Sequence, residues 1–170
     1  MLLNDRLETS RLIVRPFTPE DAGPLVALFA DPRVHRHVDD GQPLGEEMAR
    51  LWVVRSGENL VRHGYGTGAV VLRETGKLIG WAGFARPGDG SEELIYGLAP
   101  AHWRRGLGTE LLDALVAFGR TRGIDPLRAT VAPANIGSIR LLEKAGFTLA
   151  ERGYDGDADC DLYLRRLSPE

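Results

Sequence analysis

A loop with two glycines, placed directly before a helical pattern, constrains this chain most. The stretch Ala101-His-Trp-Arg-Arg-Gly-Leu-Gly-Thr-Glu-Leu-Leu112 leads into leucines at helical spacing, which predict an amphipathic helix over 106–123. The first N–H groups of a helix are unpaired and lie at the positive end of its dipole, so the loop is suited to bind an anion. The same glycines would also suit a tight helix entry with solvated arginines. The local sequence leaves both interpretations open.

The remaining pattern predicts one α+β domain over residues 1–170, built around one sheet. Hairpin turns at 74–77 and 86–90 make three of the strands an antiparallel meander. No repeat, low-complexity segment or Pro/Gly/Ser-rich linker interrupts the order. The expected strands are 11–17, 69–73, 77–84, 93–99, 127–131, 147–152 and 160–167, and the expected helices are 18–30, 45–63, 106–123 and 135–145.

Charge and composition exclude several classes of partner. Lys and Arg number 21 against 24 Asp and Glu, and the net charge of −3 gives no general attraction to nucleic acid or to an anionic membrane. No apolar run approaches the roughly 18 residues of a membrane-spanning helix, and the first residues lack the pattern of a signal peptide. A single cysteine, Cys160, fits a reducing compartment. We therefore expect a cytoplasmic protein, either a monomer or a homodimer.

Two common nucleotide-binding loops do not match the glycine loop. A P-loop needs a lysine followed by Ser or Thr after its second glycine, and no lysine stands there. A dinucleotide fingerprint needs a third glycine, where Glu110 and Leu111 follow Gly108 instead.

Three motifs in a fixed order resemble a known family. They are Leu7-Glu-Thr-Ser-Arg-Leu-Ile-Val-Arg-Pro-Phe17 with Pro19-Glu-Asp21 after it, Tyr96-Gly-Leu-Ala-Pro-Ala-His-Trp-Arg-Arg-Gly-Leu-Gly-Thr109, and Asn135-Ile-Gly-Ser-Ile-Arg-Leu-Leu-Glu-Lys-Ala-Gly-Phe147. Together they resemble the GNAT-fold acyltransferases, and within them the RimJ/RimL-like branch, which includes enzymes that acetylate the N-termini of ribosomal proteins. The resemblance covers nearly the whole chain.

The resemblance implies a fold and a cosubstrate. The fold has a mostly antiparallel N-terminal sheet, splayed central strands and flanking helices, and the cosubstrate is acetyl-CoA, with no metal. Trp103 takes the first position of the family's loop motif, as is usual for this branch. The pantetheine arm would pair with backbone near Leu98 and Ala99, between the fourth and fifth strands. The coenzyme pyrophosphate would lie on the N–H groups of Arg104, Arg105, Gly106, Leu107, Gly108 and Thr109.

Acetyl transfer from a thioester to an amine needs a neutral amine and a proton for the leaving thiolate. An α-amino group, with a pKa of about 7.7 to 8.0, is an easier nucleophile than a lysine side chain at about 10.4. A carboxylate base matters most for the harder nucleophile. Glu92 and Glu93 are the nearest candidates, and Glu93 stands where the branch commonly has Glu. Both also fit exposed carboxylates at a strand edge, with water as the base.

Asn135 and Ser138 lie three residues apart, on one face of the expected helix 135–145. Each also suits an ordinary helix start, Asn135 as the N-cap and Ser138 as a first-turn residue. By resemblance, Asn135 contacts the coenzyme arm and Ser138 protonates the departing thiolate. Many family members use a tyrosine beyond this helix for the second role, so Tyr154 is the second candidate.

The remaining motifs give weaker evidence about function. In Asp155-Gly-Asp-Ala-Asp-Cys-Asp161 a cysteine stands where a calcium loop needs Gly, so a solvated hairpin tip is expected. His35 and His37 have no zinc-ligand spacing and are expected in a loop. Cys160 has no histidine partner in the sequence pattern, which favours direct transfer in a ternary complex over a covalent intermediate. Trp52 and Trp81 belong either to the core or to a cleft wall.

These observations predict an N-acetyltransferase that moves an acetyl group from acetyl-CoA to a primary amine of a protein or peptide N-terminus or of a small molecule. One alternative is an antibiotic or small-metabolite amine acetyltransferase on the same scaffold. Another is a coenzyme-A-binding regulatory module without catalysis. The segments 34–45, 57–68 and 154–161 are expected to select the acceptor.

Overall fold

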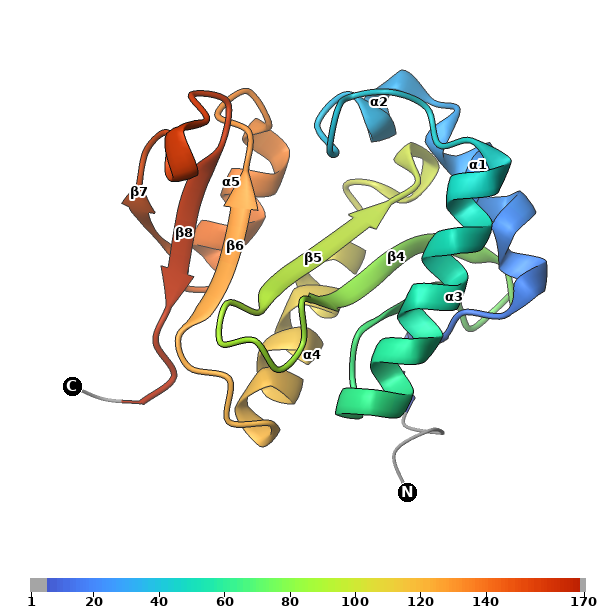
Figure 1. Ribbon diagram of the computed structural model, residues 1–170, viewed down its shortest axis with the longest axis horizontal. Helices are drawn as coiled ribbons and strands as arrows, with labels where there is room; N and C mark the ends of the chain where they lie inside the picture. Colours follow the sequence, from blue (N-terminus) through green and yellow to red (C-terminus); the bar gives the residue numbers. More distant parts are fainter. Residues whose placement is uncertain (1–5, 169–170) are drawn as a thin grey trace.

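One mixed sheet organises the computed structural model, which describes residues 6–168 (Figure 1). Within these residues the sheet has eight strands in the order β1-β2-β3-β4-β5-β6-β8-β7. The strands are Leu7–Glu8 (β1), Leu12–Pro16 (β2), Thr67–Leu72 (β3), Leu78–Ala85 (β4), Glu93–Leu98 (β5), Leu127–Val131 (β6), Thr148–Glu151 (β7) and Asp161–Arg165 (β8). The α-helices are Ala22–Phe29 (α1), Pro32–His35 (α2), Glu46–His63 (α3), Leu107–Thr121 (α4) and Ile136–Lys144 (α5).

The two halves of the sheet meet at a single parallel pair. Neighbouring strands from β1 to β5 run antiparallel, as do β6, β8 and β7. Strands β5 and β6 run parallel and share one register pair, Glu93 with Arg128. Beyond that pair they separate toward their carboxyl ends, which leaves an opening in the sheet (Figure 1). The predicted meander, splayed strands and α+β class are confirmed.

Helices cover both faces of the sheet. Helices α1 and α3 lie on one face and α4 and α5 on the other (Figure 1). The face under α4 holds the largest core cluster, to which Leu111, Leu112 and Leu115 contribute fully buried side chains. The leucine spacing of the sequence therefore marks the buried stripe of α4. No helix within the described residues combines the length and hydrophobicity that a membrane crossing requires.

Helix α2 is not predicted by the sequence pattern, because four residues are too few to show a helical period. Asp31 caps it by accepting the Arg33 N–H at 2.9 Å, and Pro32 takes the first helical position. The expectation that His35 lies in a loop is therefore wrong. Its Nδ1 is 2.8 Å from the carbonyl oxygen of Gly41, a contact that holds the following segment against the helix.

An aromatic cluster on the α1 and α3 side depends on one glycine. Trp81, only 5% exposed, lies 4.7 Å from Phe29 between ring centroids and 6.2 Å from Trp52. The Trp81 ring crosses β5 directly over Gly97, where a Cβ atom would stand 2.1 Å from the ring. No larger residue fits under the indole, so Gly97 allows the aromatic cluster to form.

Replacing Gly97 with Ala should lower the free energy of unfolding by about 1–3 kcal/mol, because the new methyl group overpacks against Trp81. Gly57→Ala is the matched control. Gly57 lies inside α3, and a Cβ atom added there would meet nothing within 4 Å, so this change should raise stability by about 0.5–1 kcal/mol. Urea unfolding of both variants measures the two changes in the free energy of unfolding. Equal changes of the same sign would contradict the role of Gly97 under the Trp81 ring.

Candidate functional site

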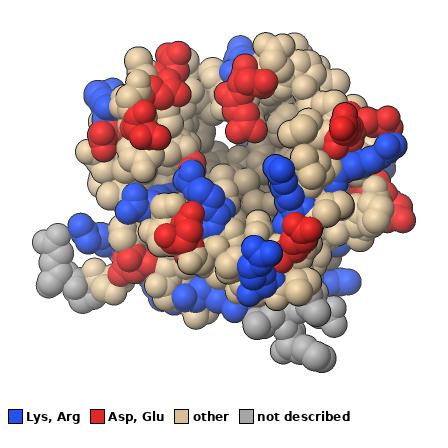
Figure 2. Space-filling view, in the orientation of Figure 1, with Lys and Arg blue, Asp and Glu red and all other residues tan. Residues whose placement is uncertain are grey.

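A cavity of about 420 Å³ lies at the opening between β5 and β6. In the space-filling view the surface is hollowed there, between the side formed by β6 to β8 and the side formed by α2 (Figure 2). Residues from both halves of the sheet line the cavity. Strands β4 and β5, α3 and the segment after α2 contribute Trp81, Glu93, Tyr96, Trp52, His37 and Val38, and β6 and the start of α5 contribute Ala129, Thr130, Val131, Asn135 and Ser138.

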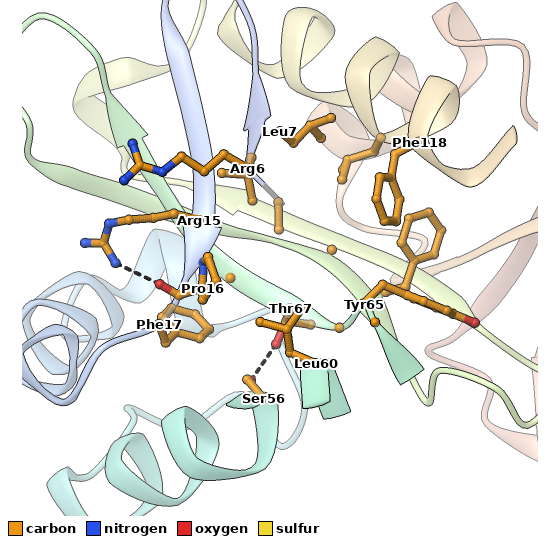
Figure 3. Close-up of a pocket in the computed structure, with 18 of the residues that line it drawn as sticks. Arg6, Leu7, Arg15, Pro16, Phe17, Ser56, Leu60, Tyr65, Thr67 and Phe118 are labelled. Atoms are coloured by element: carbon orange, nitrogen blue, oxygen red, sulfur yellow. Dashed lines mark hydrogen bonds between the residues drawn. The ribbon is translucent and has the colours of Figure 1, made fainter. Parts of the chain in front are cut away.

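A second cavity, of about 390 Å³, lies at the other end of the sheet between α3 and α4 (Figure 3). The guanidinium groups of Arg6 and Arg15 lie away from the rings of Tyr65 and Phe118 that line it (Figure 3). Arg15 is paired with Asp21 at 2.7 Å. This cavity therefore presents few polar groups that converge on a ligand. None of the residues predicted for catalysis lines it, and the first cavity is the candidate site.

Ser138 meets an unexpected partner in the first cavity. The hydroxyl oxygens of Ser138 on α5 and Tyr96 on β5 are 2.8 Å apart. Burial raises the pKa of Tyr96 to about 12, against the opposing effect of the Ser138 hydrogen bond, so the phenol stays protonated at neutral pH. The sequence does not single out Tyr96, because its partner lies 42 residues away.

Asn135 has a structural task as well as a place in the cavity. It is the N-cap of α5, and its side-chain oxygen accepts the Ser138 N–H at 3.3 Å. The capping interpretation is therefore correct for Asn135, and it fixes the first turn on which Ser138 stands. The side-chain NH₂ of Asn135 remains to donate toward the cavity.

Glu93 connects the two strands where the opening begins. One carboxylate oxygen accepts the N–H of Thr130 on β6 at 3.2 Å and its hydroxyl, and the other pairs with Arg86 at 2.8 Å. The side chain is 16% exposed. Glu92, in contrast, accepts the Tyr65 hydroxyl at 2.9 Å and does not line the cavity. Of the two candidate bases, the structure brings only Glu93 to the cavity.

Tyr154 is not brought to the site by any contact in residues 6–168. It lies in a short 3-10 helix, Tyr154–Gly156, where its N–H donates to the carbonyl of Cys160 at 2.7 Å. It is not among the residues that line the cavity. A role for Tyr154 stays a prediction, without the hydroxyl contact that Ser138 has.

The acceptor segments divide between the two cavities. His37, Val38, Asp39 and Leu44, from the expected segment 34–45, line the first cavity. The segment 57–68 lines the second cavity instead, and 154–161 lines neither. Helix α3 contributes Met48, Leu51, Trp52 and Arg55 to the first cavity, so the cleft-wall alternative for Trp52 is confirmed. Burial, with a smaller effect of Arg36, lowers the pKa of His37, which favours its neutral form.

The glycine loop adopts a conformation that leaves its backbone exposed. Gly106 is the N-cap of α4 with φ at 76°, and Arg104 has φ at 59°, both in the left-handed region. The side chains of Arg104 and Arg105 are exposed, whereas Leu107 is buried in the core. Gly108 has a further task, because a Cβ there would stand 2.9 Å from the Leu141 side chain of α5. It lets the two helices pack.

Trp103 ties this loop to the end of β5. Its indole N–H donates to the carbonyl of Leu98 at 2.8 Å. The Ala99 N–H donates to Ile79 across β4 at 2.7 Å, and its carbonyl accepts the His102 N–H at 2.9 Å. Because polar groups alternate along an antiparallel strand, those of Leu98 face the opening. Of the predicted pair, Leu98 is therefore the residue whose N–H faces the opening, whereas the Ala99 N–H is used within the sheet.

Comparisons with known proteins identify the family. Residues 11–148 match the family model described as an acetyltransferase (GNAT) domain.

The chain belongs to the GNAT acetyltransferases.

Its relatives agree with this assignment. The uncharacterized N-acetyltransferase YoaA of Bacillus subtilis is 31% identical over 152 residues, which cover 83% of this chain and 81% of YoaA. An acetyltransferase from Agrobacterium tumefaciens has a TM-score of 0.82 at 27% identity, over 95% of this chain and 94% of that one. RimL, a ribosomal L7/L12 alpha-N-protein acetyltransferase in complex with coenzyme A, has a TM-score of 0.78 over 95% and 98% of the two chains. Its 19% identity shows the fold alone.

The chain is thus an acyl-CoA-dependent N-acetyltransferase. GNAT acetyltransferases use acetyl-CoA. The loop before α4 has the exposed helix N-terminus that suits an anion such as a pyrophosphate. Helix α4 is 15 residues long, and its N-terminal N–H groups lie beside the exposed Gly106. A Cβ on Gly106 would project within 3.4 Å of the Arg11 guanidinium and occupy part of this surface. Within residues 6–168, no group of three His, Cys, Asp or Glu is arranged to hold a metal ion.

Glu110, in the first turn of α4, connects the glycine loop to the turn between β1 and β2. Its carboxylate accepts hydrogen bonds from the hydroxyls of Thr9 and Ser10, at 2.5 and 3.1 Å, and from the Arg11 backbone N–H at 2.8 Å. It also pairs with the Arg11 guanidinium at 2.7 Å, and that group donates to the carbonyl of Arg105 at 2.8 Å. The turn between β1 and β2 thereby clamps the loop. The sequence gives no sign of this pairing, because its partners are about a hundred residues apart.

The clamp makes stability depend on pH. Burial alone would raise the pKa of Glu110, but hydrogen bonds from Thr9 and Arg11 outweigh it and lower the pKa from 4.5 to about 2. A carboxyl whose pKa is depressed on folding stabilises the protein above pH 4.5. That contribution is lost as the pH falls from 4.5 toward 2.

Glu110→Gln should lower the free energy of unfolding by about 2 kcal/mol at pH 7, because charge-assisted hydrogen bonds are lost. The difference in Tm between wild type and this variant should shrink as the pH falls from 4.5 to 2. Glu47→Gln, at an exposed position in the first turn of α3, is the control and should show no such trend. Thermal melts at pH 7, 4.5 and 2.5 measure this, and a constant difference would contradict the clamp.

Proposed function

We propose that this enzyme transfers the acetyl group of acetyl-CoA directly to a primary amine, within the RimJ/RimL-like branch of the family. The observation that carries the proposal is the meeting of Ser138, Asn135 and Glu93 in one cavity. The loop suited to the coenzyme does not line this cavity, but Trp103 joins it to the end of β5 through the Leu98 carbonyl. These residues come from both sides of the opening between β5 and β6. The cavity thus has room for a thioester and an amine at the same place.

Each residue of the site has a proposed task. The N–H groups of the loop from Arg104 to Thr109 bind the pyrophosphate, and the Leu98 N–H and Asn135 NH₂ bind the pantetheine arm. Ser138 donates its hydroxyl proton to sulfur as the carbon–sulfur bond breaks and its electron pair stays on sulfur. Glu93, directly or through water, accepts the proton that the amine nitrogen loses as the carbon–nitrogen bond forms. Solvent returns a proton to Ser138, so amide and free thiol are the products.

The acceptor side of the cavity supports an amine on an apolar body. Trp52 and Trp81 line the cavity together with Ser138. An α-amino group has a pKa near enough to 7 that a useful fraction is neutral without a strong base. This suits Glu93, whose oxygens are already engaged by Arg86 and Thr130. The RimL neighbour, whose name gives an alpha-N-protein acetyltransferase, supports a peptide N-terminus as the acceptor.

The environment of Cys160 favours direct transfer over a covalent acetyl-cysteine intermediate. It is half-buried, and desolvation raises the pKa of its thiol, so little thiolate is present at neutral pH. It does not line the cavity. A covalent acetyl-cysteine step is therefore disfavoured.

Free-thiol release from acetyl-CoA tests the proposal across peptides with free N-termini, the same peptides with blocked N-termini and a free lysine, aminoglycosides and polyamines. Peptides with an apolar first residue and a free N-terminus should give the highest kcat/KM. Initial-rate plots should intersect, as expected for a ternary complex, and Cys160→Ala should retain wild-type kcat. Preference for aminoglycosides would favour the small-molecule alternative. Parallel plots with an inactive Cys160 variant would contradict direct transfer.

The loop assignment is tested by two matched glycine changes at the two ends of α4. Gly106→Ala and Gly123→Ala both place a methyl group on a residue with positive φ, at 76° and 69°. Each should cost about 1–2 kcal/mol of stability. Only Gly106→Ala should also weaken coenzyme A binding, by about tenfold or more, because its methyl group lies at the N-terminus of the helix. Calorimetric titration checks this, and equal affinities in the two variants would place the pyrophosphate elsewhere.

A further inference from the structure

Tyr96 has a hydroxyl in the candidate site to which the proposed chemistry assigns no task. Its ring packs against the main core, and its side chain reaches from β5 across the opening to α5. The hydroxyl oxygen lies 2.8 Å from Ser138 Oγ and 3.4 Å from the Ser138 carbonyl oxygen. Both acceptors within its reach therefore belong to Ser138.

The direction of this hydrogen bond follows from acidity. A phenol is a stronger acid than the aliphatic hydroxyl of serine, so the Tyr96 O–H is the better donor of the two. Burial keeps the phenol protonated across the neutral range, because it raises the pKa of Tyr96 to about 12. Tyr96 therefore donates and Ser138 Oγ accepts.

This contact decides where the proton of Ser138 points. A serine in the first turn of a helix has nearby backbone acceptors for its hydroxyl and would otherwise bond to one of them. Here a lone pair of Oγ is occupied by Tyr96, and the Ser138 N–H is occupied by Asn135. The hydrogen of Ser138 is left to point into the cavity that both side chains line.

We propose that Tyr96 is a positioning residue for the acetyl transfer: its hydroxyl donates to Ser138 Oγ and directs the serine proton to the departing sulfur. The inference rests on the proposed function. As the serine O–H bond breaks and the S–H bond forms, negative charge develops on Oγ. The hydrogen bond from Tyr96 then becomes charge-assisted and stabilises that charge. Tyr96 keeps its own proton throughout, so the balance of the reaction is unchanged.

A double-mutant cycle tests this, with Tyr96→Phe, Ser138→Ala and the double variant, assayed with the best amine acceptor. Ser138→Ala should lower kcat by about 100-fold, the lower range for a positioned proton donor. Tyr96→Phe should lower kcat by about tenfold and leave the KM and Kd for acetyl-CoA within about twofold of wild type. The double variant should match Ser138→Ala alone, because Tyr96 acts only through the serine. A merely structural role would instead give additive losses.

Tyr65→Phe is the matched control. It also removes a half-buried phenol that donates a hydrogen bond, here to Glu92 outside the candidate site, and it should keep wild-type kcat. Replacing Tyr96 with 3-fluorotyrosine retains the shape and the donor, and should keep kcat within about twofold of wild type. This second variant tests the donor even if the phenylalanine variant folds poorly.

The outcomes separate this inference from the proposed function. Wild-type kcat in Tyr96→Phe, additive losses in the double variant, or a fluorotyrosine variant as slow as the phenylalanine one would overturn the role of Tyr96 alone. A wild-type enzyme that binds acetyl-CoA and acetylates no amine would overturn both.

Discussion

The single parallel pairing between β5 and β6 is the constraint on which the site depends. The two strands share one register pair, Glu93 with Arg128, and the Glu93 carboxylate fastens β5 to Thr130 on β6 at that point. Beyond it the backbone groups facing the gap lack a strand partner, which a ligand with its own amide groups can supply. The opening is thus both a gap in the hydrogen bonding of the sheet and the place where the site residues meet.

Two contacts, one local and one long-range, hold the glycine loop in place. Trp103 joins the loop to the last residue of β5 through the Leu98 carbonyl, and Glu110 joins it to the turn between β1 and β2. The loop itself has two left-handed residues, Arg104 and Gly106, and needs such support. In the proposed function, rigid attachment of the loop lowers the entropic cost of binding a flexible cosubstrate.

Patterns local in sequence predicted most of the fold. The leucine spacing of α4, the turns of the meander and the Asn135 cap each depend on residues within a few positions of one another, and each element is confirmed within a few residues. The short helix α2 has too few residues for a period. The glycine motif indicated the loop, but the spacing could not show that Gly108 serves helix packing against Leu141. The order of motifs, more than any single motif, indicated the family.

Contacts between residues far apart in the chain could not be predicted from the sequence. Tyr96 and Glu110 look like an ordinary strand tyrosine and an ordinary first-turn acid until folding places them against Ser138 and Arg11. The reverse holds for Glu92, which is adjacent to Glu93 in sequence but turns away from the cavity to Tyr65. In each case the topology of the sheet, rather than the residue type, decides which side chain belongs to the site.

Hydrogen–deuterium exchange with and without coenzyme A tests most directly the claim that the opening between β5 and β6 is the binding site. Added coenzyme should slow exchange in residues 98–112, which contain the end of β5, the loop and the first turn of α4, and in the first turn of α5. Residues 64–68, which border the second cavity, should exchange at an unchanged rate. Protection confined to 64–68, with the loop unaffected, would contradict the account.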